Sequence, residues 1–383
     1  MCSSDLLRTA LTQAYQNNPQ LNAQRAALRV TDEGVPQALS GYRPRISVTA
    51  EGTRQSFDTL TQSPTNFSLS RTRADNGFQS YRGTITQTLF NGHQTASRTR
   101  QAEQLVSAGR ETLRTTEQTV LLSAATSYMN LIRDEALLQL QRSNVQVLDE
   151  QLRQVRDRFA VGEVTRTDVA QSESRLAAGR SSMLAAESNL TTSRSSYRQV
   201  IGIEPGKLVP ASPVDRLSPP TLPQAIAMAR ARHPTVTSAM FNVDAAAFQV
   251  KIAEGSLYPT VEVVGSVQKN FLAQNSVTQL ESSNASLLGR VTVPVYQGGS
   301  EFSTIRQAKE TLQQRRIDLD TARDQAQQTL VQAWGQLEAA KAQIQATQAQ
   351  VAAAEIALNG VREEARAGQR TTLDVLKIGR AHV

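Results

Sequence analysis

The chain has 383 residues, of which 4% are aromatic and 20% charged, with a mean hydropathy of −0.37 and a formal net charge of +7. This polarity excludes a helical membrane protein, because no run of about 18 apolar residues is present. The basic excess is scattered among acidic residues, which argues against nucleic-acid binding. Few aromatics beside abundant Ala, Gln, Ser, Thr and Arg favour long, narrow helices.

The two ends do not continue the patterns beside them. Reverse translation of Met1–Leu6 and of Lys377–Val383 gives nearly complementary strings, as a sequencing adapter read at both ends would give. We therefore expect 1–6 and 377–383 to be adapter remnants, with native termini as the alternative, and a native signal peptide to be missing. Cys2 then indicates neither a lipid anchor nor a metal site, and a cysteine-free remainder fits an exported protein.

The remaining chain is an internal tandem repeat. Ala14–Leu21 aligns with Ala229–Val236, which places Pro19 on Pro234. Further along, Gly83 aligns with Gly289, and the offset of 206 residues is then kept to the end. We predict two structural repeats, 7–200 and 224–376, joined by a Pro-rich linker at 201–223, with the second repeat truncated.

Each repeat opens with a predicted helix, Leu7–Leu39 or Leu222–Gly255, followed by a proline that begins extended chain. Two strands then follow in each repeat. They are expected at Arg45–Gln55 and Tyr81–Phe90 in the first, and at Thr260–Phe271 and Ser286–Tyr296 in the second. The segments between them are rich in Ser, Thr, Asn and Gln and are expected to be solvent-exposed loops. Pro294 fits only near the end of its strand.

Strands of about ten residues with weak alternation, separated by polar loops, are typical of transmembrane β-strands. An exposed soluble hairpin is the alternative, but both hairpins occur at the same point of the repeat. Four strands cannot close a membrane-spanning barrel, which needs about eight. Several chains would therefore have to share one barrel.

A very long, proline-free helix is predicted after each hairpin, at Gln94–Ala160 and Ser300–Ala365. About 65 residues at 1.5 Å each span roughly 100 Å. Apolar residues recur at a spacing of seven, which predicts helices packed side by side in a coiled coil rather than a lone amphipathic helix. They are Ala124, Leu131, Leu138, Val145, Leu152 and Phe159, with Leu330, Leu337, Ile344, Val351, Leu358 and Ala365 at the same places in the second repeat.

A Gly-x-x-Thr-x-x-Asp-Val motif stands at the end of each long helix. Its members are Gly162, Thr165 and Asp168 in the first repeat, and Gly368, Thr371 and Asp374 in the second. The glycine suits the left-handed residue after a helix. Thr165 or Thr167 can cap the returning helix, with Asp168 in its first turn. The motif therefore predicts a tight turn between antiparallel helices.

With this layout, the strings "NNPQL", "GYRPRISV", "LFNGHQTASRTRQAE", "RFAVGEVTRTDVAQSESRL" and "TTLDVL" resemble the TolC family of outer-membrane channel-tunnels, in its alphaproteobacterial form. The resemblance implies a mainly α protein with β structure. Each protomer would contribute four transmembrane strands to a shared trimeric barrel of twelve, continued by periplasmic coiled-coil helices. The linker at 201–223 would lie in an equatorial belt around the tunnel.

The resemblance also implies a function and partners. The homotrimer would be a passive exit duct in the outer membrane, extending into the periplasm, for a tripartite efflux pump or a type I secretion system. Its partners would be outer-membrane lipid, a periplasmic adaptor (membrane fusion protein) and an inner-membrane pump or ABC transporter. No phosphate loop, Gly-x-Ser-x-Gly or plausible triad is present, so we expect neither an enzyme nor a cofactor.

The family pattern assigns roles to three residues of the turns. Arg370 would link to Asp168 and hold the periplasmic entrance shut. Asp374 would line the constriction, where three carboxylates facing one another favour cations. Helix capping alone is the alternative for both aspartates. Ala365 stands where the family often has a gate tyrosine, so an aromatic gate contact is not expected.

A second reading from the residues is a periplasmic coiled-coil adaptor or scaffold without a pore. Such a protein normally has one hairpin between other domains, whereas this chain has two hairpins and two strand pairs. His93, His233 and His382 are isolated from one another in the sequence, and no metal site is expected.

Overall fold

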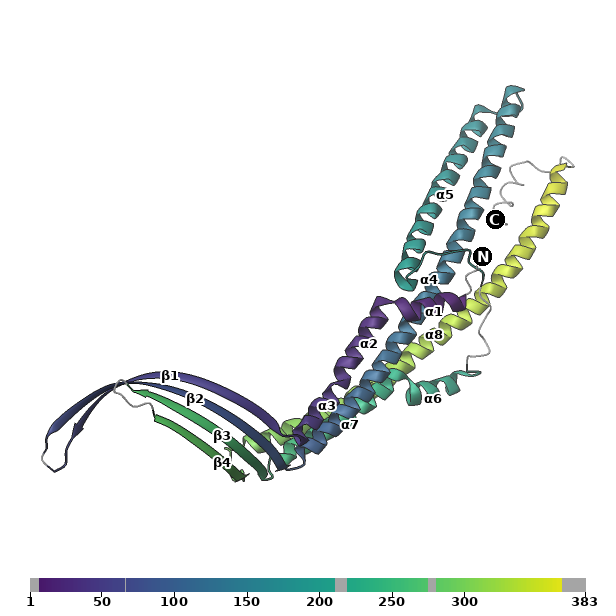
Figure 1. The fold of residues 1–383 in the computed structure, drawn as a ribbon. Coiled ribbons are helices and arrows are strands. Elements are labelled where there is room, and N and C mark those ends of the chain that lie inside the picture. Colours follow the sequence, from purple (N-terminus) through teal and green to yellow (C-terminus); the bar gives the residue numbers. More distant parts are fainter. Residues whose placement is uncertain (1–6, 66, 211–218, 275–279, 367–383) are drawn as a thin grey trace. The chain divides into compact units, whose positions relative to one another are not determined.

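A computed structural model describes residues 7–65, 67–210, 219–274 and 280–366 of the chain (Figure 1). The chain divides into two compact units. One unit draws on 1–26, 111–236 and 323–383, and the other on 27–110 and 237–322. The long helices run through both units, and the sheet lies within the second.

Four strands form one antiparallel sheet in the order β1-β2-β3-β4 (Figure 1). They are β1 (Arg45–Gln62), β2 (Leu69–Asn91), β3 (Thr260–Gln274) and β4 (Leu280–Thr292). The central pairing joins β2 to β3, which come from distant parts of the sequence. The two predicted strand pairs therefore make one continuous surface rather than two separate hairpins.

The predicted boundaries of the strands were wrong at the turns. Much of the polar segment 56–80, expected as a loop, is strand, because Ser56 pairs with Asp75 and the ladder continues to Gln62 opposite Leu69. A ladder satisfies the backbone of Ser and Thr as well as it does that of Val. β4 ends at Thr292 instead of Tyr296, so Pro294 lies just past the strand, where its missing N–H costs no ladder bond.

The predicted first helix of each repeat is broken into shorter helices. The first becomes α1 (Leu7–Asn17), α2 (Pro19–Asp32) and α3 (Gly34–Leu39), with a 3-10 turn, η1 (Ser40–Tyr42), before the sheet. The second becomes α6 (Leu222–Arg232) and α7 (Pro234–Gly255). Both breaks before α2 and α7 lie at a proline, which disfavours helical backbone in the residue before it.

Asn18 explains the first break in detail. Its side-chain oxygen accepts hydrogen bonds from the amides of Gln20 and Leu21, at 2.9 and 3.2 Å, and so caps α2. Its side-chain amide donates to the Val200 carbonyl at 2.9 Å. The break therefore fastens the N-terminal helices to the end of the helix that contains Val200.

The two predicted long helices are confirmed as α4 (Gln94–Ala160) and α8 (Ser300–Arg366). α5 (Arg166–Ile201) returns antiparallel beside the second half of α4 (Figure 1). The heptad seam of α4 is buried at Ala124, Leu131, Leu138 and Leu152, although Phe159 near the turn is 45% exposed. On α4, the spacing of seven therefore identified a real packing seam.

The same seam on α8 is only partly buried in the part of the chain that the structure describes. Ile344 and Val351 are 58% and 41% exposed, whereas Leu358 is buried. The first two line a shallow groove with Gln343, Thr347, Gln348, Ala352 and Glu355. The prediction of a buried seam was thus wrong for these two positions, which are the repeat counterparts of positions that α5 covers on α4.

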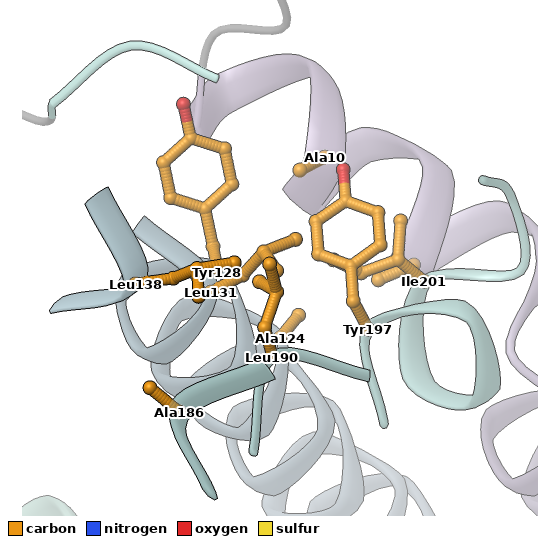
Figure 2. Close-up of a cluster of buried hydrophobic side chains, with 10 residues drawn as sticks. Ala10, Ala124, Tyr128, Leu131, Leu138, Ala186, Leu190, Tyr197 and Ile201 are labelled. Carbon is orange, nitrogen blue, oxygen red and sulfur yellow. The ribbon is translucent and has the colours of Figure 1, made fainter. Parts of the chain in front are cut away.

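The main core of the first unit joins α1, α4 and α5. Figure 2 shows Tyr128 and Leu131 of α4 meeting Tyr197 and Ile201 of α5 beneath Ala10 of α1. All five side chains are at most 1% exposed. A smaller cluster in the second unit packs Val250 and Ala253 of α7 against Ile305 and Ala308 of α8. These are small and medium side chains, as the composition indicated.

Candidate functional site: the two-faced sheet and the helical turn

One face of the sheet carries an apolar band two rows deep, and beyond Val267 the same face carries Lys269, which pairs with Glu281. Residues opposite one another in paired strands project from the same face, and alternate residues along a strand project from opposite faces. One row across the sheet reads Ile46, Ile85, Gly265, Leu287, and the next but one reads Val48, Gly83, Val267, Ala285. Ile46, Val48 and Leu287 are 74%, 78% and 81% exposed. Nothing described in this chain covers this apolar face.

The other face is mostly polar, although Val264 and Leu288 lie on it. The row between those two reads Ser47, Thr84, Ser266, Ser286, and the row beyond it reads Thr49, Arg82, Gln268, Asn284. Hydrogen bonds connect neighbouring strands across this face. Ser266 Oγ lies 2.8 Å from Ser286 Oγ, and Arg82 Nη2 donates to Gln268 Oε1 at 2.7 Å. An ion pair of 3.1 Å joins Arg290 to Glu262 on the same face.

A sheet apolar on one face and hydrogen-bonded on the other can separate hydrocarbon from water. The sequence predicted the strands, but it did not point to any residue of the polar network. Period-two alternation was the available signal, and it is weak because the rows consist largely of Ser, Thr, Gly and Gln. The pairing of β2 with β3, which brings Arg82 to Gln268, is not visible in either strand alone.

The turn between α4 and α5 gathers three residues singled out in the sequence. Gly162 has a φ of 82°, and its amide donates to the Phe159 carbonyl at 3.0 Å. Thr165 is the N-cap of α5, and its hydroxyl accepts a hydrogen bond from the Asp168 amide at 3.3 Å. The Asp168 carboxylate accepts one from the Thr165 amide at 2.8 Å. The two residues form a reciprocal capping box.

The carboxylate of Asp168 is therefore held within its own turn. Oδ2 also accepts a hydrogen bond from the Thr165 hydroxyl at 2.7 Å. The bonds from the Thr165 hydroxyl and amide, with the positive charge of Arg158 nearby, lower the pKa of Asp168 below its usual value. Asp168 is an anion at neutral pH, fixed in place at the turn.

The second copy of the motif lies outside the described residues. This holds for Gly368, Arg370, Thr371 and Asp374, so the expected link between Arg370 and Asp168 and the expected constriction at Asp374 stay predictions. Within the described ranges, no group of three or more His, Cys, Asp or Glu side chains is arranged to hold a metal ion. The helices in the same ranges include none with the length and hydrophobicity of a membrane span.

Comparison with known proteins decides the family. The model of the outer membrane efflux protein family matches residues 10–203 and 225–381. The chain belongs to the outer membrane efflux protein family. It is 39% identical over 374 residues to the outer membrane efflux protein BepC of Brucella suis, covering 97% of this chain and 78% of that protein. It is 23% identical to the outer membrane protein TolC of Escherichia coli, covering 98% and 76%.

Solved structures show the same fold. The open-state MtrE outer membrane channel of Neisseria gonorrhoeae superposes with a TM-score of 0.78 at 17% identity, over 98% of this chain and 83% of that one. The outer membrane protein VceC of Vibrio cholerae gives 0.75 at 19% identity, over 98% and 89%. The mainly helical fold with a four-stranded antiparallel sheet is thus that of a channel-tunnel protomer.

Membership in this family fixes the general role of the chain. It is an outer-membrane efflux channel of the TolC type, an exit duct that lies in the outer membrane and extends into the periplasm. The family consists of transport proteins, so the chain is not an enzyme. Membership in the family also implies a trimeric assembly that works with efflux pump partners. The expected resemblance to TolC proteins is confirmed, and the pore-free scaffold is set aside.

Proposed function

We propose that three copies of this chain share one twelve-stranded barrel, each with two structural repeats, 7–200 and 224–376, joined by an equatorial linker at 201–223. The pore takes substrates from a periplasmic adaptor and an inner-membrane pump or ABC transporter. The helical turns form its periplasmic entrance, and the sheet forms its wall in the membrane.

The observation that carries this proposal is the two-faced sheet. Ile46, Val48 and Leu287 project from one face, where lipid solvates them better than water does. The hydrogen-bonded face of Arg82, Gln268 and Ser266 suits a water-filled lumen. Four strands are too few for a closed wall, so the free edges of β1 and β4 are satisfied by neighbouring copies.

At the entrance, we propose that Arg370 links to Asp168 and keeps the turns together. The supporting observation is that Asp168 is an anion held by its own capping box, with a second oxygen to offer a guanidinium. Three copies of Asp374 at the constriction would form a negative ring that favours cations. No step of transport requires chemistry from the chain, since the partner pump supplies the energy.

The test is single-channel conductance of the purified protein in a planar lipid bilayer. A small, steady, cation-selective conductance is expected. Arg370→Ser should raise the conductance several-fold by loosening the entrance, and Asp374→Asn should reduce cation selectivity without a comparable rise. Folded, detergent-extracted trimers that never conduct would overturn the proposal of a pore.

A matched control separates the gate from a general effect of charge. Arg153 is an exposed arginine of α4, paired with Glu150 on its own helix at 2.8 Å. Arg153→Ser removes the same charge from α4, nine residues before Gly162 of the turn, and should leave the conductance unchanged. If it opens the channel as much as Arg370→Ser does, the proposed link to Asp168 is wrong.

A further inference from the structure

Four ion pairs connect α4 to α5 along their shared length. In each, the nitrogen and oxygen atoms lie between 2.6 and 3.7 Å apart. All eight side chains are partly exposed, so each pair alone contributes little to stability. In order of increasing distance from the α4–α5 turn, the pairs are Arg156–Glu173, Asp149–Arg180, Arg142–Glu187 and Glu135–Arg194.

The pairs, which we call the charge ladder, follow a strict rule. Each step moves seven residues back along α4 and seven residues forward along α5. The sign alternates at every step. Along α4, basic and acidic residues alternate, and along α5 the partner residues alternate in the opposite order. Flanking charges at heptad spacing are the positions that set orientation and partner choice in coiled coils.

Alternation has a consequence that four pairs of one polarity would lack. If α5 slips by one heptad in one direction, Arg156 meets Arg180, Asp149 meets Glu187, and Arg142 meets Arg194. If it slips in the other direction, Asp149 meets Glu173, Arg142 meets Arg180, and Glu135 meets Glu187. In either slipped register, every ladder residue that still faces another ladder residue faces one of the same charge. The apolar seam, which repeats every seven residues, distinguishes these registers only through the sizes of its side chains, as where Gly179 packs against Leu148.

A buried polar contact lies on the same interface. Asp134 is 4% exposed, and its carboxylate accepts a hydrogen bond from Ser193 Oγ of α5 at 2.5 Å. Its other oxygen accepts one from Arg133 Nε at 2.9 Å. A slip by one heptad would take Ser193 about 10 Å away along the axis and leave a buried carboxylate without that donor.

We propose that the alternating charge ladder and the Asp134–Ser193 contact set a single register for the α4–α5 pair. They are positioning residues, and what they position is the turn at Gly162 and Thr165. A helix pair that cannot slip presents this turn at one fixed height. The proposed register does not rest on the proposed periplasmic entrance, because the helix pair would keep this register whether or not the turn at Gly162 closes a pore.

The experiment measures the register directly in the full-length protein. Spin labels are placed on cysteines at the exposed positions Gln146 of α4 and Ser195 of α5, which lie about 20 Å apart along the helix axis in the native register, with Cys2→Ser removing the existing thiol. Labelled chains are diluted with unlabelled ones, and pulsed electron-spin resonance gives the distance distribution. A slip by one heptad displaces one label by about 10 Å along the axis.

The decisive variant makes each helix uniform in sign. Asp149→Arg and Glu135→Arg with Arg180→Asp and Arg194→Glu keep four attractive pairs in the native register and the same net charge. They also make the slipped registers attractive. We expect a second distance population that is absent from the wild type. Asp134→Leu in this background should enlarge it.

The control exchanges the two residues of all four pairs, which inverts every sign but keeps the alternation, and should show one distance. If the uniform variant does not fold, exchanging only Asp149 and Arg180 makes two of the three slipped contacts attractive and should give a smaller second population. A single wild-type distance in every folded variant would overturn the proposal. Channel conductance plays no part in this readout, so a failed pore and a failed charge ladder would be told apart.

Discussion

Tyr128 and Val209 are joined by two hydrogen bonds across 81 residues of sequence. The phenol hydroxyl of Tyr128, on α4, donates to the Val209 carbonyl at 2.7 Å and accepts from the Val209 amide at 3.2 Å. The Tyr128 ring is fully buried in the core of α1, α4 and α5. One hydroxyl thus satisfies both backbone groups of a residue in the Pro-rich linker and fastens that linker to the helices.

Tyr128→Phe should destabilise the protein by about 1 to 2 kcal/mol, because both Val209 groups lose their partner while the ring still fills its place. Urea unfolding followed by tryptophan fluorescence measures the change. The control is Tyr15→Phe, since Tyr15 donates to Glu117 at 3.0 Å from an exposed site. Equal losses of unfolding free energy in the two variants would show that the buried bonds to Val209 stabilise the protein no more than an exposed tyrosine hydrogen bond does.

Neighbouring leucines on β4 test the two faces of the sheet. Leu287 belongs to the apolar row of Ile85 and Gly265, whereas Leu288 projects from the face of Glu262 and Arg290. Leu287→Lys should cost about 2 to 4 kcal/mol if it lies near the middle of the membrane. Leu288→Lys should cost much less, because its ammonium meets water and a polar wall.

The measurement is the unfolding free energy of each leucine variant in lipid vesicles, with the yield of trimer in outer membranes as a second readout. The pair is matched in residue type, strand and depth. The assignment of faces would be wrong if Leu288→Lys were the more damaging of the two.

The capping box at the turn should be sensitive to acid. The folded-state pKa of Asp168 is lowered, so its contribution to stability is present above the unfolded pKa of about 3.9 and is lost as the pH falls through the folded value. Amide exchange in the first turn of α5, corrected for intrinsic rates, should be unchanged between pH 7 and pH 5. It should become faster below about pH 4.

Thr165→Ala should raise amide exchange in this turn at every pH, corresponding to about 1 kcal/mol of lost cap. Thr167→Ala, at an exposed neighbour outside the capping box, is the matched control. If Asp168→Asn left the exchange at pH 7 untouched, the carboxylate would have no role in the cap.

Two glycines with positive φ separate backbone strain from packing. Gly92 has a φ of 64°, and a Cβ there would lie 2.2 Å from the Gly255 carbonyl oxygen. Gly162 has a φ of 82°, with nothing within 4 Å of the same atom. Gly162→Ala should cost about 1 kcal/mol, the price of a left-handed alanine.

Gly92→Ala should cost several kcal/mol, because backbone must move to admit the methyl group. Thermal unfolding of both variants side by side gives the difference. Similar melting temperatures would show that the Gly255 carbonyl does not obstruct a methyl group at Gly92.

The long helices could be read from the sequence, because a proline-free stretch with apolar residues at a spacing of seven leaves few alternatives. α4 begins and ends where it was predicted, and α8 differs by one residue at its end. The spacing of seven also located the buried seam on α4. It could not show that Ile344 and Val351 would be exposed, since burial depends on which helix lies across the seam.

The sheet was harder to predict for a physical reason. A strand between lipid and water needs one apolar face only along the part that lies in lipid. Near the turn, residues on both faces can be polar. The sequence of Ser56–Gln62 therefore resembles that of a loop. The break at Asn18 was not predicted, because "NNPQL" was interpreted as part of one continuous helix. An asparagine directly before a proline was the local signal for a cap.

The open edges of the sheet carry a consequence for how the protein is made. β1 and β4 each present a row of unsatisfied backbone groups, beside side chains such as Leu287 that water solvates poorly. A chain that completed its sheet alone would be a template for uncontrolled aggregation. Folding of the strands, association of the copies and entry into lipid are therefore expected to be one concerted event. The refolding rate should accordingly rise with chain concentration, while the helical pair of α4 and α5 forms independently of it.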